Sequence, residues 1–146
     1  MSKTSQGLAG RLGGMSKAPT LYPLMRFSDA PAAIEFLERA FGFSCDIVIP
    51  NSDGTINHAE LSLGPSVLML GSDRDDPRLG RRSGLGWIYV AVDDPDTHCR
   101  RARAAGAEIL AEPYDTDYGS RDYTARDREG NQWHFGTHRP SPRTEP

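Results

Sequence analysis

Ser28-Asp29-Ala30-Pro31 begins the segment that decides the fold, because its pattern returns 65 residues later as Asp93-Asp94-Pro95. The first copy continues as an amphipathic helix that ends at Phe41-Gly42, and the second as a helix that ends at Gly106. In both copies an aspartate is placed to cap the helix, and a proline occupies the first turn, where its missing N–H costs little. The glycine after each helix suits the left-handed position that ends many helices.

Alternating apolar segments surround both helices and predict strands. One strand is expected before each helix, at 21–27 and 87–92, and three after it, so the order β-α-β-β-β occurs twice. A unit of this size is too small to bury its own apolar face. We therefore predict the α+β class, with two βαβββ modules packed as one domain around a shared cleft.

The composition excludes several classes of protein. The chain has 146 residues, of which 37% are hydrophobic and 25% charged, as in globular soluble domains. A net charge of -3 without a dense basic run argues against nucleic acid, and no apolar run is long enough for a membrane span. Residues 1–19 lack the apolar core of a secretory signal. Cys45 and Cys99 lack a metal or redox spacing, which favours reduced thiols and a cytoplasmic location.

The domain is expected to span residues 20–138, with modules at about 20–71 and 86–138. The polar segments 1–19 and 139–146 are expected to be loose tails. Between the modules, the charged linker 72–85 is expected to be a lid, a binding loop or a disordered connection.

Two hairpins carry a resemblance to a known family. Asp127-Arg128-Glu129-Gly130-Asn131-Gln132-Trp133-His134-Phe135-Gly136-Thr137 resembles the closing hairpin of the vicinal oxygen chelate superfamily, which includes glyoxalase I, bleomycin-resistance proteins and extradiol dioxygenases. His58-Ala59-Glu60-Leu61-Ser62-Leu63-Gly64, with Val67-Leu68-Met69-Leu70, resembles the first hairpin of PhnB-like members. The resemblance covers about residues 20–138. It implies a cup-shaped mixed sheet and a homodimer in which the cups are completed across the interface.

In metal-dependent members of this family, four ligands come from equivalent positions on the first and last strands of the two modules. The 65-residue repeat places those positions here at Tyr22, Met69, Trp87 and His134. Only His134 is a common ligand of zinc, nickel or iron, since a thioether suits copper(I). The sequence therefore predicts no metal and no other cofactor.

Strand alternation predicts which side chains face the cleft. Gln132 and His134 are expected to share a face with Tyr123 and Ala125, while Trp133 points into the core. The predicted ligand-binding residues combine an aromatic wall with a few polar anchors, a composition typical of small-molecule pockets: Tyr22, Arg26, His58, Glu60, Met69, Trp87, Tyr89, Tyr123, Gln132 and His134.

Several of these residues also have a simpler interpretation. Tyr22 and Trp87 either stack on a flat or cationic ligand or merely fill the space of a metal. His58 and Glu60 supply either a general base or a remnant metal pair completed by His134. The simpler alternative is a surface or rim pair with ordinary hydrogen bonds. His134 itself is either a ligand or a hydrogen-bonded cleft histidine.

Arg26 and two other histidines complete the expectations from the sequence. Arg26 either binds an anionic group or pairs with Glu60. His98 and His138 are expected to be exposed.

The sequence thus favours a glyoxalase- or bleomycin-resistance-like protein that binds a small, partly aromatic molecule in a metal-free cleft. The alternative is a metal-dependent lyase, isomerase or dioxygenase that uses His58, Glu60 and His134. The two differ in whether stoichiometric metal is present and in whether activity depends on His134. The expected partners are a small-molecule ligand and a second copy of the chain.

Overall fold

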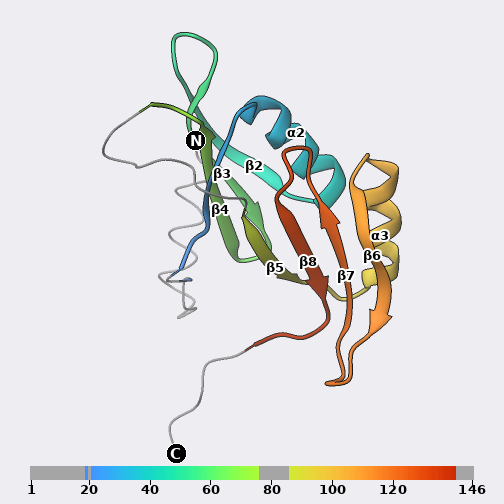
Figure 1. The fold of residues 1–146 in the computed structure, drawn as a ribbon. Helices are drawn as coiled ribbons and strands as arrows, with labels where there is room; N and C mark the ends of the chain where they lie inside the picture. The colour runs from blue at the N-terminus through green and yellow to red at the C-terminus, as the bar shows by residue number, and fades with distance from the viewer. Residues whose placement is uncertain (1–18, 20, 76–85, 141–146) are drawn as a thin grey trace, which may run out of the picture.

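The computed structural model describes residue 19, residues 21–75 and residues 86–140. Most of the predicted tails and of the linker 72–85 lies outside these residues, although Ser72 belongs to a strand. The described elements follow the order β-α-β-β-β twice, which confirms the predicted α+β fold of two modules (Figure 1). Among the described residues, no helix combines the length and the apolarity that a membrane crossing requires.

The first module contains one helix and a four-stranded sheet, and the second module repeats this arrangement. The elements of the first are β1 (Leu24–Phe27), α2 (Ala30–Phe41), β2 (Ser44–Pro50), β3 (Ile56–Leu63) and β4 (Ser66–Ser72). Those of the second are β5 (Trp87–Ala91), α3 (Pro95–Ala104), β6 (Glu108–Asp115), β7 (Arg121–Arg126) and β8 (Gln132–Gly136). The strand orders are β1-β4-β3-β2 in the first sheet and β5-β8-β7-β6 in the second.

The predicted helix caps are confirmed. Asp29 accepts a hydrogen bond from the backbone N–H of Ala32 at 3.1 Å, and Asp94 accepts one from Thr97 at 3.2 Å. Gly42 follows α2 with φ +83°, a left-handed conformation that glycine adopts without steric cost. The helix ends are therefore fixed by local sequence.

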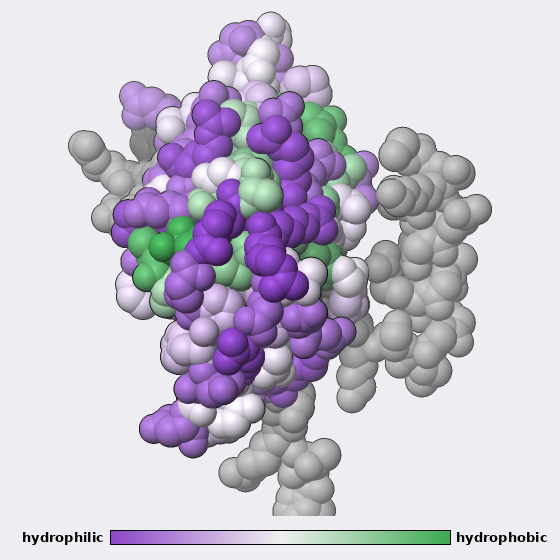
Figure 2. Space-filling model, turned by 90° about the vertical axis from the view of Figure 1, so that its right-hand side faces the viewer, coloured by the Kyte–Doolittle hydropathy of each residue, from purple (hydrophilic) through white to green (hydrophobic). Residues whose placement is uncertain are grey.

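The two sheets pair their first and last strands in the same register. Leu24 of β1 lies opposite Met69 of β4, and Tyr89 of β5 lies opposite His134 of β8. Both helices cover the same side of the sheets (Figure 1). The outer surface on that side is mostly hydrophilic (Figure 2). The opposite surface of the sheets is not covered by either helix and is called the open face below.

Aromatic side chains join the modules on the helical side of the sheets. Phe41, at the end of α2, packs against Trp133 and Phe135 of β8 with ring centroids 5.2 and 4.9 Å apart. Trp133 is fully buried, as predicted. Arg101 of α3 adds polar contacts by donating to the carbonyl groups of Glu38 and Arg39 at the end of α2.

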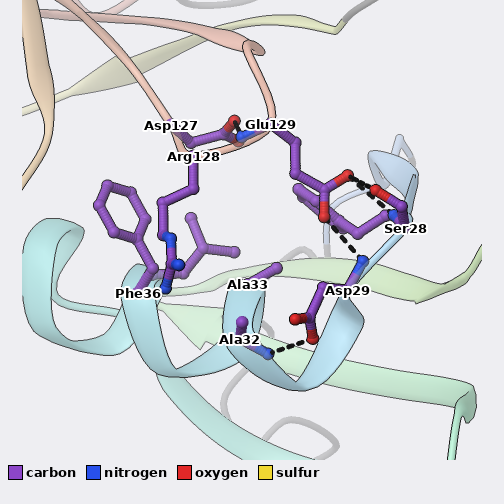
Figure 3. Close-up of a pocket in the computed structure, with 10 residues that line it drawn as sticks. Ser28, Asp29, Ala32, Ala33, Phe36, Asp127, Arg128 and Glu129 are labelled. Carbon is purple, nitrogen blue, oxygen red and sulfur yellow. Dashed lines mark hydrogen bonds between the residues drawn. The ribbon is translucent and has the colours of Figure 1, made fainter.

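The turn before β8 makes a second joint between the modules. Buried Asp127 accepts hydrogen bonds from the backbone N–H groups of Glu129 and Asn131 and from the indole N–H of Trp133, each at 3.0 Å. Glu129 reaches across to Ser28 and Asp29 at the start of α2 (Figure 3). A small cavity of about 200 Å³ lies beneath these contacts. The charged residues Asp127 and Glu129 of the closing hairpin thus stabilise the turn and the contact between the modules.

Candidate functional site

The open face of the second sheet contains an aromatic pair that its strand register brings together. Trp87 begins β5, and its ring centroid lies 5.5 Å from that of His134 on β8. The Trp87 side chain is 70% exposed, so few protein contacts hold it. Trp87 also lies directly opposite Gln132, and Tyr89 opposite His134. These four residues therefore lie together, on the face predicted for them.

His134 has one satisfied and one unsatisfied ring nitrogen. Its Nδ1 lies 3.1 Å from the hydroxyl of Thr124, the cross-strand neighbour on β7. Its Nε2 is buried and has no hydrogen-bond partner among the described residues. A buried polar atom without a partner costs free energy, so this nitrogen marks a place where a further group would be stabilising.

The open face of the first sheet holds a polar pair. His58 Nε2 and a carboxylate oxygen of Glu60 are 2.9 Å apart on β3, and each side chain is about one third exposed. Glu60 lies opposite Met69 of β4. Tyr22 precedes β1 and is partly exposed. The pair is a local hydrogen bond, as the simpler interpretation expects.

The expected pairing of Arg26 with Glu60 is wrong. The guanidinium of Arg26 donates to the carbonyl of Arg74, and its Nε lies 3.8 Å from a carboxylate oxygen of Asp73. The cross-strand partner of Arg26 is Gly71, so no side chain stands beside it on β4. Arg26 is thus held at the end of β4, away from Glu60.

The predicted placement of Tyr123 in the cleft is also wrong. The turn closes so that Arg126 pairs with Gln132 and Thr124 with His134. This register is one residue away from the expected one, and such a shift moves every side chain of a strand to the other face. Tyr123 is consequently fully buried on the helical side, where its ring stacks on Phe135 at 4.9 Å.

His98 on α3 is partly buried rather than exposed. Its Nδ1 shares a hydrogen bond with the hydroxyl of Tyr123, and its ring lies 4.3 Å from that of Phe135. Burial, with a smaller contribution from Arg101, lowers the pKa of His98. The sequence carried a signal for this position, because His98 precedes the buried Ala102 by one helical turn.

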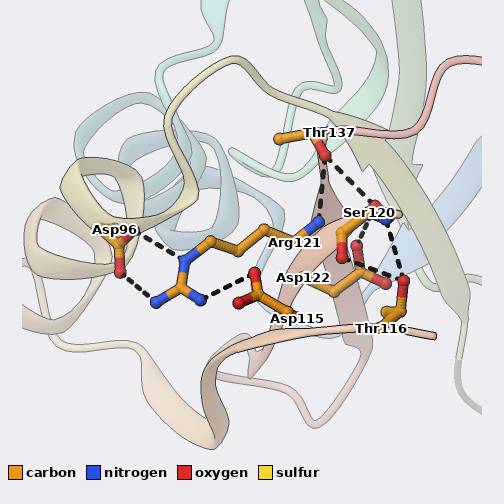
Figure 4. A network of polar contacts seen from close by, with 7 residues as sticks. All are labelled: Asp96, Asp115, Thr116, Ser120, Arg121, Asp122 and Thr137. Carbon is orange, nitrogen blue, oxygen red and sulfur yellow. Dashed lines mark hydrogen bonds and ion pairs between the residues drawn. The ribbon is translucent and has the colours of Figure 1, made fainter. Parts of the chain in front are cut away.

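The correct register brings residues to the open face that sequence reasoning missed. Asp122, two residues before Thr124, lies opposite Gly136. Its carboxylate accepts a hydrogen bond from Ser120 at 2.6 Å within a network of hydroxyl groups (Figure 4). In the same network Arg121 binds Asp96 and Asp115. These contacts hold the start of β7 against the residue that follows β8, at the end of the second sheet beyond Tyr89.

A groove of about 440 Å³ opens where the sheets meet. Tyr89 is the only one of the predicted ligand-binding residues among those that line it. Its walls come from the hairpin of the first module and from β5 of the second, and they are mainly apolar: Leu21, Pro23, Phe43, Leu63, Gly64, Pro65, Ser66, Val67, Leu68, Ile88, Tyr89, Val90, Ala91, Trp133 and Arg139. This volume is in the range of small-ligand pockets.

The four positions that supply metal ligands in this fold do not fit a divalent ion here. Tyr22, Met69 and Trp87 offer a phenol, a thioether and an indole, and only His134 offers a common ligand atom. Within the described part of the chain, no three His, Cys, Asp or Glu side chains gather closely enough to hold a metal. His58, Glu60 and His134 therefore do not form the predicted alternative site within one chain.

Comparisons with known proteins agree with this fold. The model of the Glyoxalase/Bleomycin resistance protein/Dioxygenase superfamily matches residues 21–135. An uncharacterized protein of Mycobacterium bovis is 30% identical over 125 residues, which cover 81% of this chain and 82% of that protein. An uncharacterized protein of Mycobacterium tuberculosis has the same identity, over 81% of this chain and 74% of its own length.

Solved structures show the same likeness. TioX from Micromonospora sp. ML1 superimposes with a TM-score of 0.72 at 32% identity, covering 82% of this chain and 98% of TioX. Glyoxalase I from Zea mays superimposes with a TM-score of 0.65 at 19% identity, covering 84% of this chain but only 45% of the maize enzyme. The match over residues 21–135 shows that the chain belongs to the Glyoxalase/Bleomycin resistance protein/Dioxygenase superfamily.

Proposed function

We propose that this protein binds a small, partly aromatic molecule on the open face, around Trp87, Tyr89 and His134. One observation carries the proposal: a tryptophan that is 70% exposed lies over a histidine whose buried Nε2 has no partner among the described residues. A flat ligand ring that stacks beside Trp87 would bury its apolar surface. A polar group on that ligand would satisfy His134 Nε2.

The groove gives this ligand room beyond its aromatic part. Tyr89 borders the groove and also lies beside His134 in the sheet. A molecule stacked at Trp87 can therefore extend past Tyr89 between the two modules. Because the groove is mainly apolar, the extension would be an apolar ring or chain.

We further propose that the protein is a cytoplasmic homodimer of the PhnB-like type. Leu24 and Trp87, on the edge strands β1 and β5 of the two sheets, are 67% and 70% exposed. A second copy placed over the open face would bury these side chains and complete a cup. Cys45 and Cys99 are both free thiols, which agrees with a reducing compartment.

The test is a nuclear magnetic resonance titration that follows the two tryptophan indole N–H signals. Trp87 is exposed and Trp133 fully buried, so their signals report the site and the core separately. A panel of small aromatics, such as 2-phenylethanol and quinoline, is expected to shift the Trp87 signal saturably. The substitution Trp87→Ala should weaken binding, measured by ligand-observed resonance, at least tenfold.

Tyr114→Ala is the matched control, because Tyr114 is also an exposed aromatic residue but lies on the outer strand β6. Equal loss in the two variants, or a panel that leaves the Trp87 signal unmoved, would contradict the proposal. Sedimentation of the same samples tests the dimer, for which a monomer at all concentrations is the contradicting result.

A further inference from the structure

We propose that Asp122 makes this site selective for a cationic amine, so that the preferred ligands are aromatic molecules carrying an ammonium group. The inference rests on the proposed function, because it names the chemical class of the ligand bound beside Trp87 and Tyr89. The inference is drawn from the groups that surround the carboxylate of Asp122.

Asp122 is a nearly buried acid that forms no ion pair with the residues the structure describes. The residue is only 9% exposed. The carboxylate accepts hydrogen bonds from two neutral groups, the hydroxyl of Ser120 at 2.6 Å and that of Tyr118 at 3.4 Å. No ion pair to Asp122 occurs in the described ranges. Buried charges in proteins are usually paired, since an unpaired charge loses much of its solvation.

The backbone around Asp122 seats its carboxylate over a glycine on the open face. Asp122 lies opposite Gly136, and Gly136 lies opposite Ala91 of β5. A Cβ atom on residue 136 would collide with the Asp122 carboxylate and would lie 2.8 Å from the hydroxyl of Tyr89. The carboxylate of Asp122 and the hydroxyl of Tyr89 therefore share the space over Gly136, which places the acid beside a partly exposed aromatic ring.

Aromatic rings flank this carboxylate. Tyr89 and Tyr118 are 39% and 64% exposed, and the faces of aromatic rings attract cations. Burial, together with the negative charge of Asp122, raises the pKa of both tyrosines. The positive group nearest in sequence to β8, Arg139, is held by Asp93 at 3.0 Å. An ammonium group would therefore meet negative charge and aromatic faces together.

The strand geometry sets the length of the ligand. Thr124, beside His134, and Asp122 are two residues apart on β7, which corresponds to about 7 Å along a strand. A ring stacked at Trp87 and His134 therefore reaches Asp122 through a short linker. An arylalkylamine with two carbons between the ring and the nitrogen has this length.

The experiment compares three probes of one shape: 2-phenylethylamine, 2-phenylethanol and 3-phenylpropanoate. Dissociation constants are measured at pH 7 by the shift of the Trp87 indole signal. The amine is expected to bind about tenfold more tightly than the alcohol, because hydrogen bonds between charged groups are the stronger ones. The carboxylate is expected to bind most weakly.

Asp122→Asn should abolish the advantage of the amine and leave binding of the alcohol unchanged. The amide keeps the shape and still accepts from Ser120, so the fold is expected to persist. Asp117→Asn is the matched control, since Asp117 is exposed on the turn that precedes β7 and should retain the preference.

The outcomes separate this inference from the proposed function. If the alcohol and the amine bind equally, or if Asp122→Asn keeps the preference, the amine inference is wrong while aromatic binding stands. If no probe moves the Trp87 signal, the amine inference fails together with the proposed function. An amine preference lost in Asp122→Asn and kept in Asp117→Asn would establish the inference.

Discussion

Glu129 and Ser28 are 101 positions apart in the chain, yet the carboxylate of Glu129 accepts hydrogen bonds from both the backbone N–H and the hydroxyl of Ser28, each at 2.8 Å. The second carboxylate oxygen accepts from the N–H of Asp29, also at 2.8 Å. One side chain of the second module therefore holds the start of the helix α2 in the first. Negative charge at a helix start is also favoured by the helix dipole.

Glu129→Ala is expected to lower the free energy of unfolding by about 2 kcal/mol, because three donors lose a charged acceptor. Urea denaturation measures the loss. Glu35→Ala on the exposed side of α2 is the control, with an expected change within about 0.5 kcal/mol. Equal effects of the two substitutions would show that Glu129 does not hold the modules together.

Asp127→Ala is expected to cost about 3 kcal/mol, since it leaves the buried backbone N–H of Asn131, the partly buried N–H of Glu129 and the Trp133 indole without their acceptor. Near-ultraviolet circular dichroism should show a weaker Trp133 signal. The exposed Asp117 offers a control, Asp117→Ala, that changes neither property. A variant of Asp127 with wild-type stability would mean that the turn forms without its carboxylate.

Gly136→Ala is expected to destabilise the protein by about 2 kcal/mol, because the added methyl group meets the Asp122 carboxylate. The cost should fall when Asp122 is also replaced by alanine, which a double-mutant cycle in urea measures. Additive effects of the two substitutions would place the strain elsewhere in the strand.

His98 predicts a dependence of stability on pH. Burial lowers its pKa in the folded protein below the ordinary value of 6.5, so the unfolded chain takes up the proton first. The free energy of unfolding should be unaffected above about pH 7.5 and should decrease as the pH falls from 6.5 to 5. Carboxylates such as Asp94 and Asp96, whose pKa values are also lowered, act only at more acidic pH.

His98→Gln keeps a hydrogen-bonding group beside Tyr123 but does not titrate, so it should flatten this dependence. Denaturation curves at pH 7.5 and pH 5 test the prediction. The same slope in wild type and variant would assign the dependence to another group.

The helix ends of this fold could be predicted from the sequence, because capping signals act over only a few residues. Asp29, Asp94 and Gly42 predicted the helix ends by capping chemistry that needs no distant partner. The family resemblance, mapped onto the chain through the 65-residue repeat, implied that Trp87 and His134 lie in the same cleft, and their ring centroids are 5.5 Å apart. The capping signals need no knowledge of the tertiary structure, whereas the placement of Trp87 beside His134 rested on the resemblance to the family.

The candidate site was predicted only in part, because it depends on register and on long-range contacts. A turn register one residue away from the expected one moved Tyr123 into the core and brought Thr124 to the open face. Arg26 contacts Asp73 and the carbonyl of Arg74 at the end of β4 instead of Glu60. The groove joins Val67 to Tyr89, residues that no local pattern connects.

Gly71 and Gly136 are 65 residues apart and occupy the same place in the two modules. A Cβ atom on Gly71 would meet the backbone carbonyl of Asn57, whereas one on Gly136 would meet the Asp122 carboxylate. The two modules thus carry a glycine at the same place for different reasons, since one makes room for neutral backbone and the other for an acid. A side chain at position 71 would therefore press on the backbone alone, whereas one at position 136 would displace a charged group on the open face.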